Sequence, residues 1–190
     1  MAYSLLKSFL IPLLMFIFRP KVSGLRFVPT NGPVIIASNH LSFSDSIFMP
    51  LVVPRKVTFL AKSEYFTSPG LKGFIKKITF IALGQVPIDR SGGKRSEAAL
   101  LTGLRLLKEN HCIGIYPEGT RSPDGRLYKG RTGIARMAIE SGVPVVPVAN
   151  IRMSSLLKNG SLFITNATIS AFLLSCAITA ILIESVVQFC

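Results

Sequence analysis

Cysteine is scarce in this sequence: Cys112, Cys176 and Cys190 are the three cysteines among its 190 residues. They form no C-x-x-C pair, so the sequence indicates neither a zinc site nor a framework of disulfides. We therefore expect no bound metal ion. Reduced thiols also favour a domain that faces the cytosol.

Acidic residues are few as well. Nine Asp and Glu residues stand against 22 Lys and Arg residues, which gives a formal net charge of +13. Only 16% of the residues are charged, however, and the mean hydropathy is +0.49. A nucleic-acid-binding protein usually carries more charge and is less hydrophobic, so we expect no nucleic-acid partner. The composition predicts contact with an anionic membrane surface and with anionic ligands.

Histidine is the third rare residue, with two in the chain. His40 lies at the end of the apolar run Val34–Ala37, five positions before Asp45. The pattern Ser42-x-x-Asp45 has the form of a capping box, which opens a helix. Residues five apart are rotated by about 140° on a helix. His40 and Asp45 can therefore meet only if the chain turns between them.

This His/Asp pair has two interpretations. In a turn, Asp45 could accept a hydrogen bond from one imidazole nitrogen of His40 and leave the other nitrogen free as a general base. Alternatively, Asp45 only caps a helix, where the helix dipole favours a carboxylate, and His40 is an ordinary loop histidine.

Two further apolar runs end in charged residues. The stretch His111–Tyr116 reads as a buried strand and leads to Glu118 and Arg121. The stretch Gly84–Ile88 leads to Asp89 and Arg90. Open α/β sheets form their ligand crevices at the carboxyl ends of their strands. We expect these charged pairs and the His/Asp pair to lie along one edge of a sheet.

Together these motifs resemble the glycerolipid acyltransferase family, whose blocks read N-H-x-x-x-x-D, I-D-R, E-G-T-R-S and V-P-V-V-P-V. Here the blocks are Asn39–Asp45, Ile88–Arg90, Glu118–Ser122 and Val143–Val148, in that order. They span most of residues 25–150. Within the family the chain most resembles 1-acylglycerol-3-phosphate acyltransferases, which convert lysophosphatidate to phosphatidate.

The resemblance implies roles for individual residues. His40 would take the proton from a glycerol hydroxyl that attacks an acyl thioester, and Asp45 would orient the imidazole. No enzyme nucleophile is then needed, which agrees with the absence of a G-x-S-x-G motif. The implied substrate-binding residues are Asn39, Ser42, Arg90, Glu118, Gly119, Thr120 and Arg121, with the two arginines on the acceptor phosphate. The implied acyl donor is acyl-CoA or acyl carrier protein, with no separate cofactor.

Other acceptors and a non-enzymatic role stay open at this point. The motif blocks do not distinguish lysophosphatidate from glycerol-3-phosphate or another lysophospholipid. A basic, membrane-binding remnant of the family that lacks catalysis is the remaining alternative.

Two segments predict membrane contact. Between Arg55 and Arg95 there are nine basic and two acidic residues. Inside that span, Leu71–Phe80 has an apolar face flanked by lysines, which is typical of a helix lying on a membrane surface. A helix packed on the sheet would show the same pattern. The eleven-residue apolar run Ser8–Phe18 is too short to span a bilayer and predicts a short N-terminal membrane-associating helix.

The predicted fold is α/β, with a mixed, mostly parallel sheet flanked by helices. We expect a membrane-associating segment at residues 1–24, an acyltransferase domain at 25–150 and an atypical apolar tail at 151–190. In the tail, Ile164–Ile183 is twenty residues without a charge, which is long enough for a transmembrane helix. Alternatively, the tail is an aberrant or truncated C-terminus. Expected strands are Pro33–Ser38, Val57–Ala61, Gly84–Ile88, Cys112–Tyr116 and Val145–Val148. Expected helices are Ser44–Val53, Leu71–Ile81, Lys94–Glu109 and Thr132–Ser141.

Overall fold

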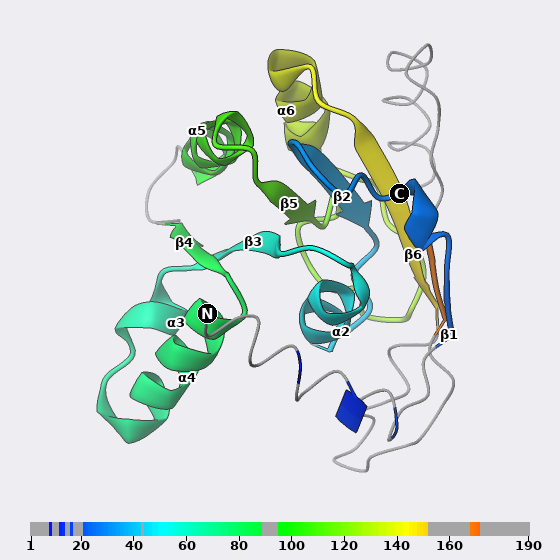
Figure 1. Ribbon diagram of the computed structural model, residues 1–190. Coiled ribbons are helices and arrows are strands. Elements are labelled where there is room, and N and C mark those ends of the chain that lie inside the picture. The colour runs from blue at the N-terminus through cyan, green and yellow to red at the C-terminus, as the bar shows by residue number, and fades with distance from the viewer. Residues whose placement is uncertain are drawn as a thin grey trace.

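The computed structural model describes residues 21–42, 44–88, 95–151 and 168–171, together with Ser8, Pro12, Leu13 and Phe16. Its strands form one seven-stranded sheet in the order β1-β7-β6-β2-β5-β3-β4 (Figure 1). The strands are β1 (Lys21–Ser23), β2 (Val34–Ser38), β3 (Val57–Lys62), β4 (Val86–Ile88), β5 (Cys112–Ile115), β6 (Val145–Ile151) and β7 (Thr168–Ala171). All neighbouring strands are parallel except β6 and β7. The α/β class and the mixed, mostly parallel sheet are thus confirmed.

Helices fill most of the connections between strands. They are the short 3₁₀ helix η1 (Leu25–Phe27), α2 (Asp45–Val52), α3 (Glu64–Thr67), α4 (Gly70–Ala82), α5 (Arg95–Lys108) and α6 (Gly133–Ser141). The four predicted helices are α2, α4, α5 and α6, and the five predicted strands are β2 to β6. The sequence did not predict η1, α3, β1 and β7.

The core lies on both faces of the sheet. Alternate residues of β2 point to opposite faces, so Val34 and Ile36 join one apolar cluster and Ile35 and Ala37 join another. The first cluster includes Phe48 of α2, and the second takes residues from α5 and α6. Figure 1 shows α5 and α6 on one side of the sheet and α2 on the other. Because β2 is covered on both faces, all five of its residues are apolar or small and buried.

Helix α4 lies apart from this core. With α3 it forms a helical pair that extends away from the sheet (Figure 1). Of the residues of α4, all of which the structure describes, only Gly73 is buried. Leu71, Phe74, Ile75 and Ile78 are 50–74% exposed. The alternative in which this apolar face packs on the sheet is therefore wrong.

The C-terminal tail has one described segment, β7, which pairs with β6 and with β1. Its residues Thr168–Ala171 belong to the stretch Ile164–Ile183, so at these four positions the chain is a strand and not the predicted transmembrane helix. The rest of that stretch, and nearly all of the predicted N-terminal helix, lie outside the described residues. Within the described part of the chain, no helix is both long and apolar enough to cross a membrane.

Candidate active site

The predicted His/Asp pair forms at the carboxyl end of β2. His40 lies in the turn after the strand, and Asp45 is the first residue of α2. The His40 Nδ1 atom lies 3.0 Å from Asp45 Oδ2. Asp45 is fully buried, whereas the His40 side chain is 16% exposed. When Nδ1 carries the proton, its N–H group donates a hydrogen bond to Asp45. The Nε2 lone pair of His40 is then free to accept a proton.

Backbone donors hold the Asp45 carboxylate in place. Its Oδ2 atom also accepts hydrogen bonds from the backbone N–H groups of Leu41, at 2.6 Å, and Ser42, at 2.8 Å. The Ser42 bond is one half of the predicted capping box. The other half differs, because Ser42 Oγ accepts from the Ser44 N–H and Ser44 is the N-cap residue. Asp45 therefore both caps the turn and contacts the His40 ring, so capping is not its only contact.

An aromatic residue covers one face of the imidazole. The ring of Tyr116, directly after β5, stacks on His40 with 3.9 Å between ring centroids and 10° between ring planes. The Tyr116 hydroxyl lies 3.2 Å from Ser46 Oγ, on α2. From the sequence, Tyr116 is predicted only as the end of a strand, because an aromatic residue at a strand end carries no signal of its partner.

The loop after β5 brings the second motif to the first. The Ser122 N–H donates to the His40 carbonyl at 2.8 Å, which ties this loop to the β2 turn. Gly119 has a φ of 72°, a left-handed conformation that glycine adopts without strain. A Cβ atom at Gly119 would also lie 3.0 Å from Nε of Arg131, so glycine gives the arginine side chain room to pack against this loop.

Glu118 is the buried carboxylate of this loop. It is 4% exposed, and neither carboxylate oxygen accepts a well-aligned hydrogen bond from a described residue. Burial raises the pKa of Glu118 above its usual value; His40 opposes this through its charge and its backbone, as does the backbone of Tyr128, and the nearby Asp45 adds to the rise. A buried carboxylate beside His40 is available to a polar group of a ligand.

The cationic residues at this edge are exposed. Arg121 and Thr120 lie at the surface of the loop, as does Arg131. The sequence predicted a role for Arg121 but not for Arg131, because no motif block includes position 131. Arg90 lies outside the described residues. Strand β4, which ends at Ile88, runs parallel to β3, which runs parallel to β5, so these strands end at the same edge of the sheet.

Asn39 is placed differently from the prediction. It is buried, and its side-chain amide donates to the Asn150 carbonyl at 2.9 Å and accepts from the Asn150 N–H at 2.7 Å. Asn150 in turn donates to Ser38 Oγ at 2.9 Å. The prediction placed Asn39 on the substrate, whereas the structure uses its amide to join the end of β2 to β6. The pairing spans 111 positions in the sequence, so local patterns could not indicate it.

Comparison with known protein families agrees with this geometry. A family model described as Acyltransferase matches residues 19–151, well over half of the chain. The chain belongs to this acyltransferase family. The match contains both residues of the His/Asp pair and the whole loop after β5.

Several curated relatives of this chain have the same printed activity. The chain is 31% identical over 150 residues to the chloroplastic 1-acyl-sn-glycerol-3-phosphate acyltransferase BAT2 of Brassica napus, which covers 78% of the chain and 42% of the relative. It is 33% identical over 147 residues to the 1-acyl-sn-glycerol-3-phosphate acyltransferase of Bacillus subtilis, covering 75% of the chain and 69% of the relative. The chain thus spans less than half of the Brassica protein.

A solved structure shares the fold of this chain. The crystal structure of the 1-acyl-sn-glycerophosphate acyltransferase PlsC from Thermotoga maritima matches with a TM-score of 0.68 at 22% identity. The match covers 98% of this chain and 78% of that one. At this identity the likeness concerns the fold.

Proposed function

We propose that this acyltransferase transfers a fatty acyl group from an acyl thioester to the free hydroxyl of lysophosphatidate, giving phosphatidate for phospholipid synthesis. The observation that carries the proposal is the 3.0 Å contact between His40 Nδ1 and Asp45 Oδ2, which leaves Nε2 free at the sheet edge. The printed activity of the relatives supports lysophosphatidate as the acceptor.

The proposed reaction needs one proton acceptor and no enzyme nucleophile. His40 Nε2 takes the proton of the acceptor hydroxyl as its oxygen attacks the thioester carbonyl carbon. Asp45 stabilises the imidazolium that forms and does not itself take the proton. The tetrahedral intermediate collapses, the carbon–sulfur bond breaks, and the imidazolium returns the proton to the leaving thiolate. The products are an ester and a free thiol.

The acceptor phosphate would be bound by arginine. A guanidinium matches two phosphate oxygens in a fork, which an ammonium group cannot do. Arg121 is exposed on the same loop as Glu118, and Arg131 packs against that loop at Gly119. We assign the phosphate to Arg121 with Arg90, and include Arg131 as a further cation. Glu118, Gly119, Thr120 and Ser42 would then line the glycerol part of the acceptor.

The donor is proposed to be acyl-CoA or acyl carrier protein, with no separate cofactor. Both carry the acyl group as a thioester, which is activated enough for direct attack by a hydroxyl. Either donor is anionic, in keeping with a chain of net charge +13.

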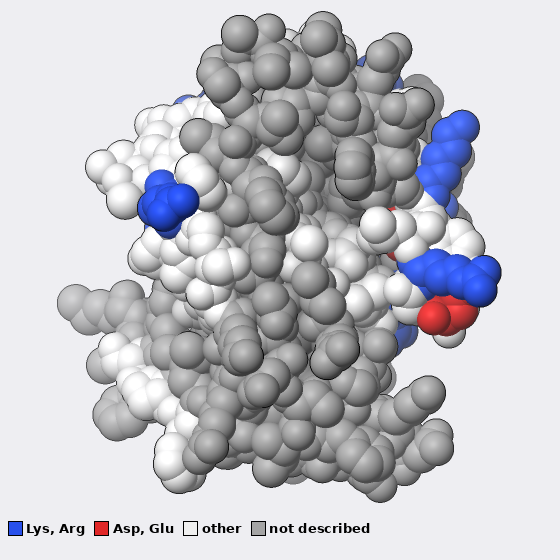
Figure 2. Space-filling view, turned by 90° about the vertical axis from the view of Figure 1, so that its right-hand side faces the viewer, with Lys and Arg blue, Asp and Glu red and all other residues white. Residues whose placement is uncertain are grey.

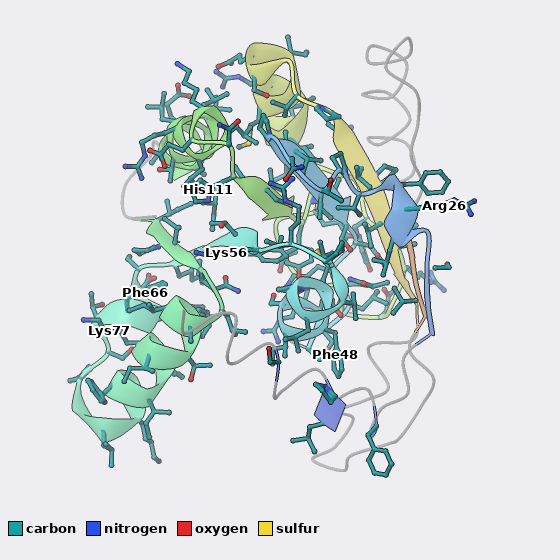
Figure 3. All side chains as sticks on the ribbon, viewed as in Figure 1. Arg26, Phe48, Lys56, Phe66, Lys77 and His111 are labelled. Atoms are coloured by element: carbon teal, nitrogen blue, oxygen red, sulfur yellow. The ribbon has the colours of Figure 1, made fainter. Side chains whose placement is uncertain are left out.

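The same enzyme is proposed to bind an anionic membrane through α4. An isolated apolar helix face of this kind is unusual on a protein that meets only water. Lys72, Lys76 and Lys77 flank the apolar face and supply positive charge next to lipid headgroups. Lys77 projects from α4 in Figure 3. Figure 2 shows the face of the molecule at the β1 edge, where the described Lys and Arg side chains are only near the margins.

We place the catalytic domain on the cytosolic side, where thiols stay reduced.

A transfer assay over a panel of acceptors tests the function. The full chain in mixed micelles is given labelled acyl-CoA or acyl carrier protein thioester with lysophosphatidate, glycerol-3-phosphate or lysophosphatidylcholine. Labelled phosphatidate formed fastest from lysophosphatidate is the expected result. Faster acylation of glycerol-3-phosphate or of lysophosphatidylcholine would change the acceptor, and no transfer to any acceptor would favour the non-catalytic, membrane-binding alternative.

Arg121→Lys adds a test of the phosphate assignment in the same assay. Because lysine keeps the charge but loses the fork, KM for lysophosphatidate should rise about tenfold, with much less change for the thioester. Equal losses toward both substrates would instead give Arg121 a role in the fold. Arg105→Lys, on the exposed side of α5, is the matched control.

A further inference from the structure

The imidazole of His40 is held at two places, by its edge and by its face. At its edge, Nδ1 lies 3.0 Å from Asp45 Oδ2. At one face, the Tyr116 ring stacks on it with 3.9 Å between ring centroids. The mechanism proposed above uses the edge contact alone. Among the described residues, no other pair of rings lies as close as His40 and Tyr116.

Helix α2 carries the anchors of both contacts. Asp45 binds His40, and the next residue, Ser46, hydrogen-bonds the Tyr116 hydroxyl at 3.2 Å. His40 follows β2, and Tyr116 follows β5, which is the parallel neighbour of β2. Two adjacent residues at the start of one helix therefore fix two rings that come from two different strands.

A third strand supports Tyr116 from behind. The Phe59 ring of β3 stacks on Tyr116 with 5.2 Å between centroids and 20° between planes. Phe59 can lie there because Gly114 of β5 has no side chain: a Cβ atom at Gly114 would lie 2.3 Å from the Phe59 ring. Burial strongly raises the pKa of Tyr116, so its phenol stays neutral and protonated. Tyr116 is thus an uncharged ring held on both sides, by Phe59 and by His40.

We propose that Tyr116 is a positioning residue for catalysis, which fixes the plane of the His40 ring so that Nε2 faces the acceptor hydroxyl and which stabilises the imidazolium by its π face. A hydrogen bond to Nδ1 alone lets the imidazole rock about that contact, and the stack removes this freedom. When His40 takes a proton, its positive charge lies against the negative face of the phenol ring, an attraction that strengthens only as the charge develops. This inference rests on the acyltransferase function proposed above.

Three variants separate the ring from its hydroxyl. Tyr116→Leu removes the ring, whereas Tyr116→Phe and Ser46→Ala each remove only the hydrogen bond. A small misplacement of a catalytic group can cost about 100-fold in rate. We therefore expect kcat for lysophosphatidate to fall roughly 10- to 100-fold in Tyr116→Leu, with KM changed by less than about threefold. Tyr116→Phe and Ser46→Ala should each cost less than about tenfold, because a neutral hydrogen bond is worth little net.

The two histidines give a spectroscopic test that needs no substrate. Protons above an aromatic face are shielded, so the Hε1 signal of His40 should lie upfield of the His111 signal in the NMR spectrum of the full chain in detergent. His111→Gln assigns the two signals. The His40 signal should move downfield in Tyr116→Leu and stay in place in Tyr116→Phe.

Each outcome decides the matter. An unshielded His40 signal in the unmodified protein, without nuclear Overhauser contacts to Tyr116, would overturn the stack, even if Tyr116→Leu fails to fold. Unchanged kcat in a folded Tyr116→Leu protein would overturn the positioning role. A raised KM at constant kcat would place Tyr116 on the substrate instead. Because the NMR result needs no acceptor, failure of the stack can be told apart from failure of the proposed function.

Discussion

At the scale of single residues, the Asp45 side chain makes the most hydrogen bonds among the described residues of the turn that holds His40. One carboxylate oxygen receives three hydrogen bonds, from the His40 ring and from the N–H groups of Leu41 and Ser42. The position at the start of α2 adds the favourable field of the helix N-terminus. Asp45 is therefore fixed by the backbone before it orients the imidazole.

Asp45→Asn tests this role. An amide at position 45 can keep part of the hydrogen bonding but loses the charge that stabilises the imidazolium and selects the Nδ1-protonated tautomer. In the Ser-His-Asp template the same change costs about 10⁴ in rate. We expect a loss of that order in kcat for acyl transfer, measured beside Glu97→Gln on α5 as a control. A loss below about tenfold would mean that His40 does not depend on the carboxylate.

Glu118 predicts a pH-dependent stability. Burial raises its pKa, so the folded chain holds this proton to a higher pH than the unfolded chain does. Stability therefore falls as the pH rises from the ordinary glutamate value of 4.5 through the raised pKa, and the penalty persists above that window. Glu118→Gln removes the penalty.

Thermal unfolding of the two proteins provides the measurement. Tm of Glu118→Gln should exceed that of the unmodified protein at pH 7 to 8 and match it near pH 4, while acyl transfer falls. Glu64→Gln, at an exposed glutamate, should show no such pH-dependent difference. A lower Tm for Glu118→Gln at neutral pH would show that Glu118 is stabilised by partners.

At the scale of elements, apolar patterns predicted the elements that pack on the core: a continuous apolar run for a strand buried on both faces, and a helical repeat for a helix buried on one face. The run Val34–Ala37 gave β2, and the leucines of α5 and the apolar side of α6 gave their helices. The short elements β1, α3 and η1 carry no such pattern, because three or four residues are too few to repeat one. Strand β7 was missed because its apolar, β-branched residues read as part of a longer hydrophobic run.

For the candidate site, the sequence predicted the local contact between His40 and Asp45 but not the contacts between distant strands. Spacing alone required a turn between His40 and Asp45, and the structure has that turn. The pairing of Asn39 with Asn150 and the stack of Tyr116 on His40 join positions 111 and 76 apart in the sequence. Such contacts depend on strand order, which no local pattern fixes.

Helix α4 carries the membrane prediction. Lys72→Gln combined with Lys77→Gln should weaken binding of the full chain to anionic vesicles by up to ~1 kcal/mol per lysine and reduce its salt dependence. The matched control replaces Arg105 and Lys108, two bases in the last turn of α5, with Gln. Vesicle flotation at several salt concentrations gives the affinities. If both double variants weaken binding equally, net charge and not α4 would govern attachment.

At the scale of the whole molecule, the parallel sheet separates the two histidines. His111 directly precedes β5 and Tyr116 directly follows it, so the site and His111 lie at opposite ends of this strand. His111 lies near the end of α5, with its Nε2 atom 3.8 Å from Glu109 Oε2 (Figure 3). His111 is therefore a matched control for His40, the proposed general base.

The most direct test compares His40→Ala with His111→Ala in the transfer of a labelled acyl group from its thioester to lysophosphatidate. Both variants remove an imidazole, but only His40 is paired with a buried carboxylate at the carboxyl edge of the sheet. We predict that His40→Ala abolishes measurable transfer while its vesicle binding persists, and that His111→Ala stays within about threefold of the unmodified rate. Near-normal turnover in the His40→Ala protein would contradict general-base catalysis by this residue.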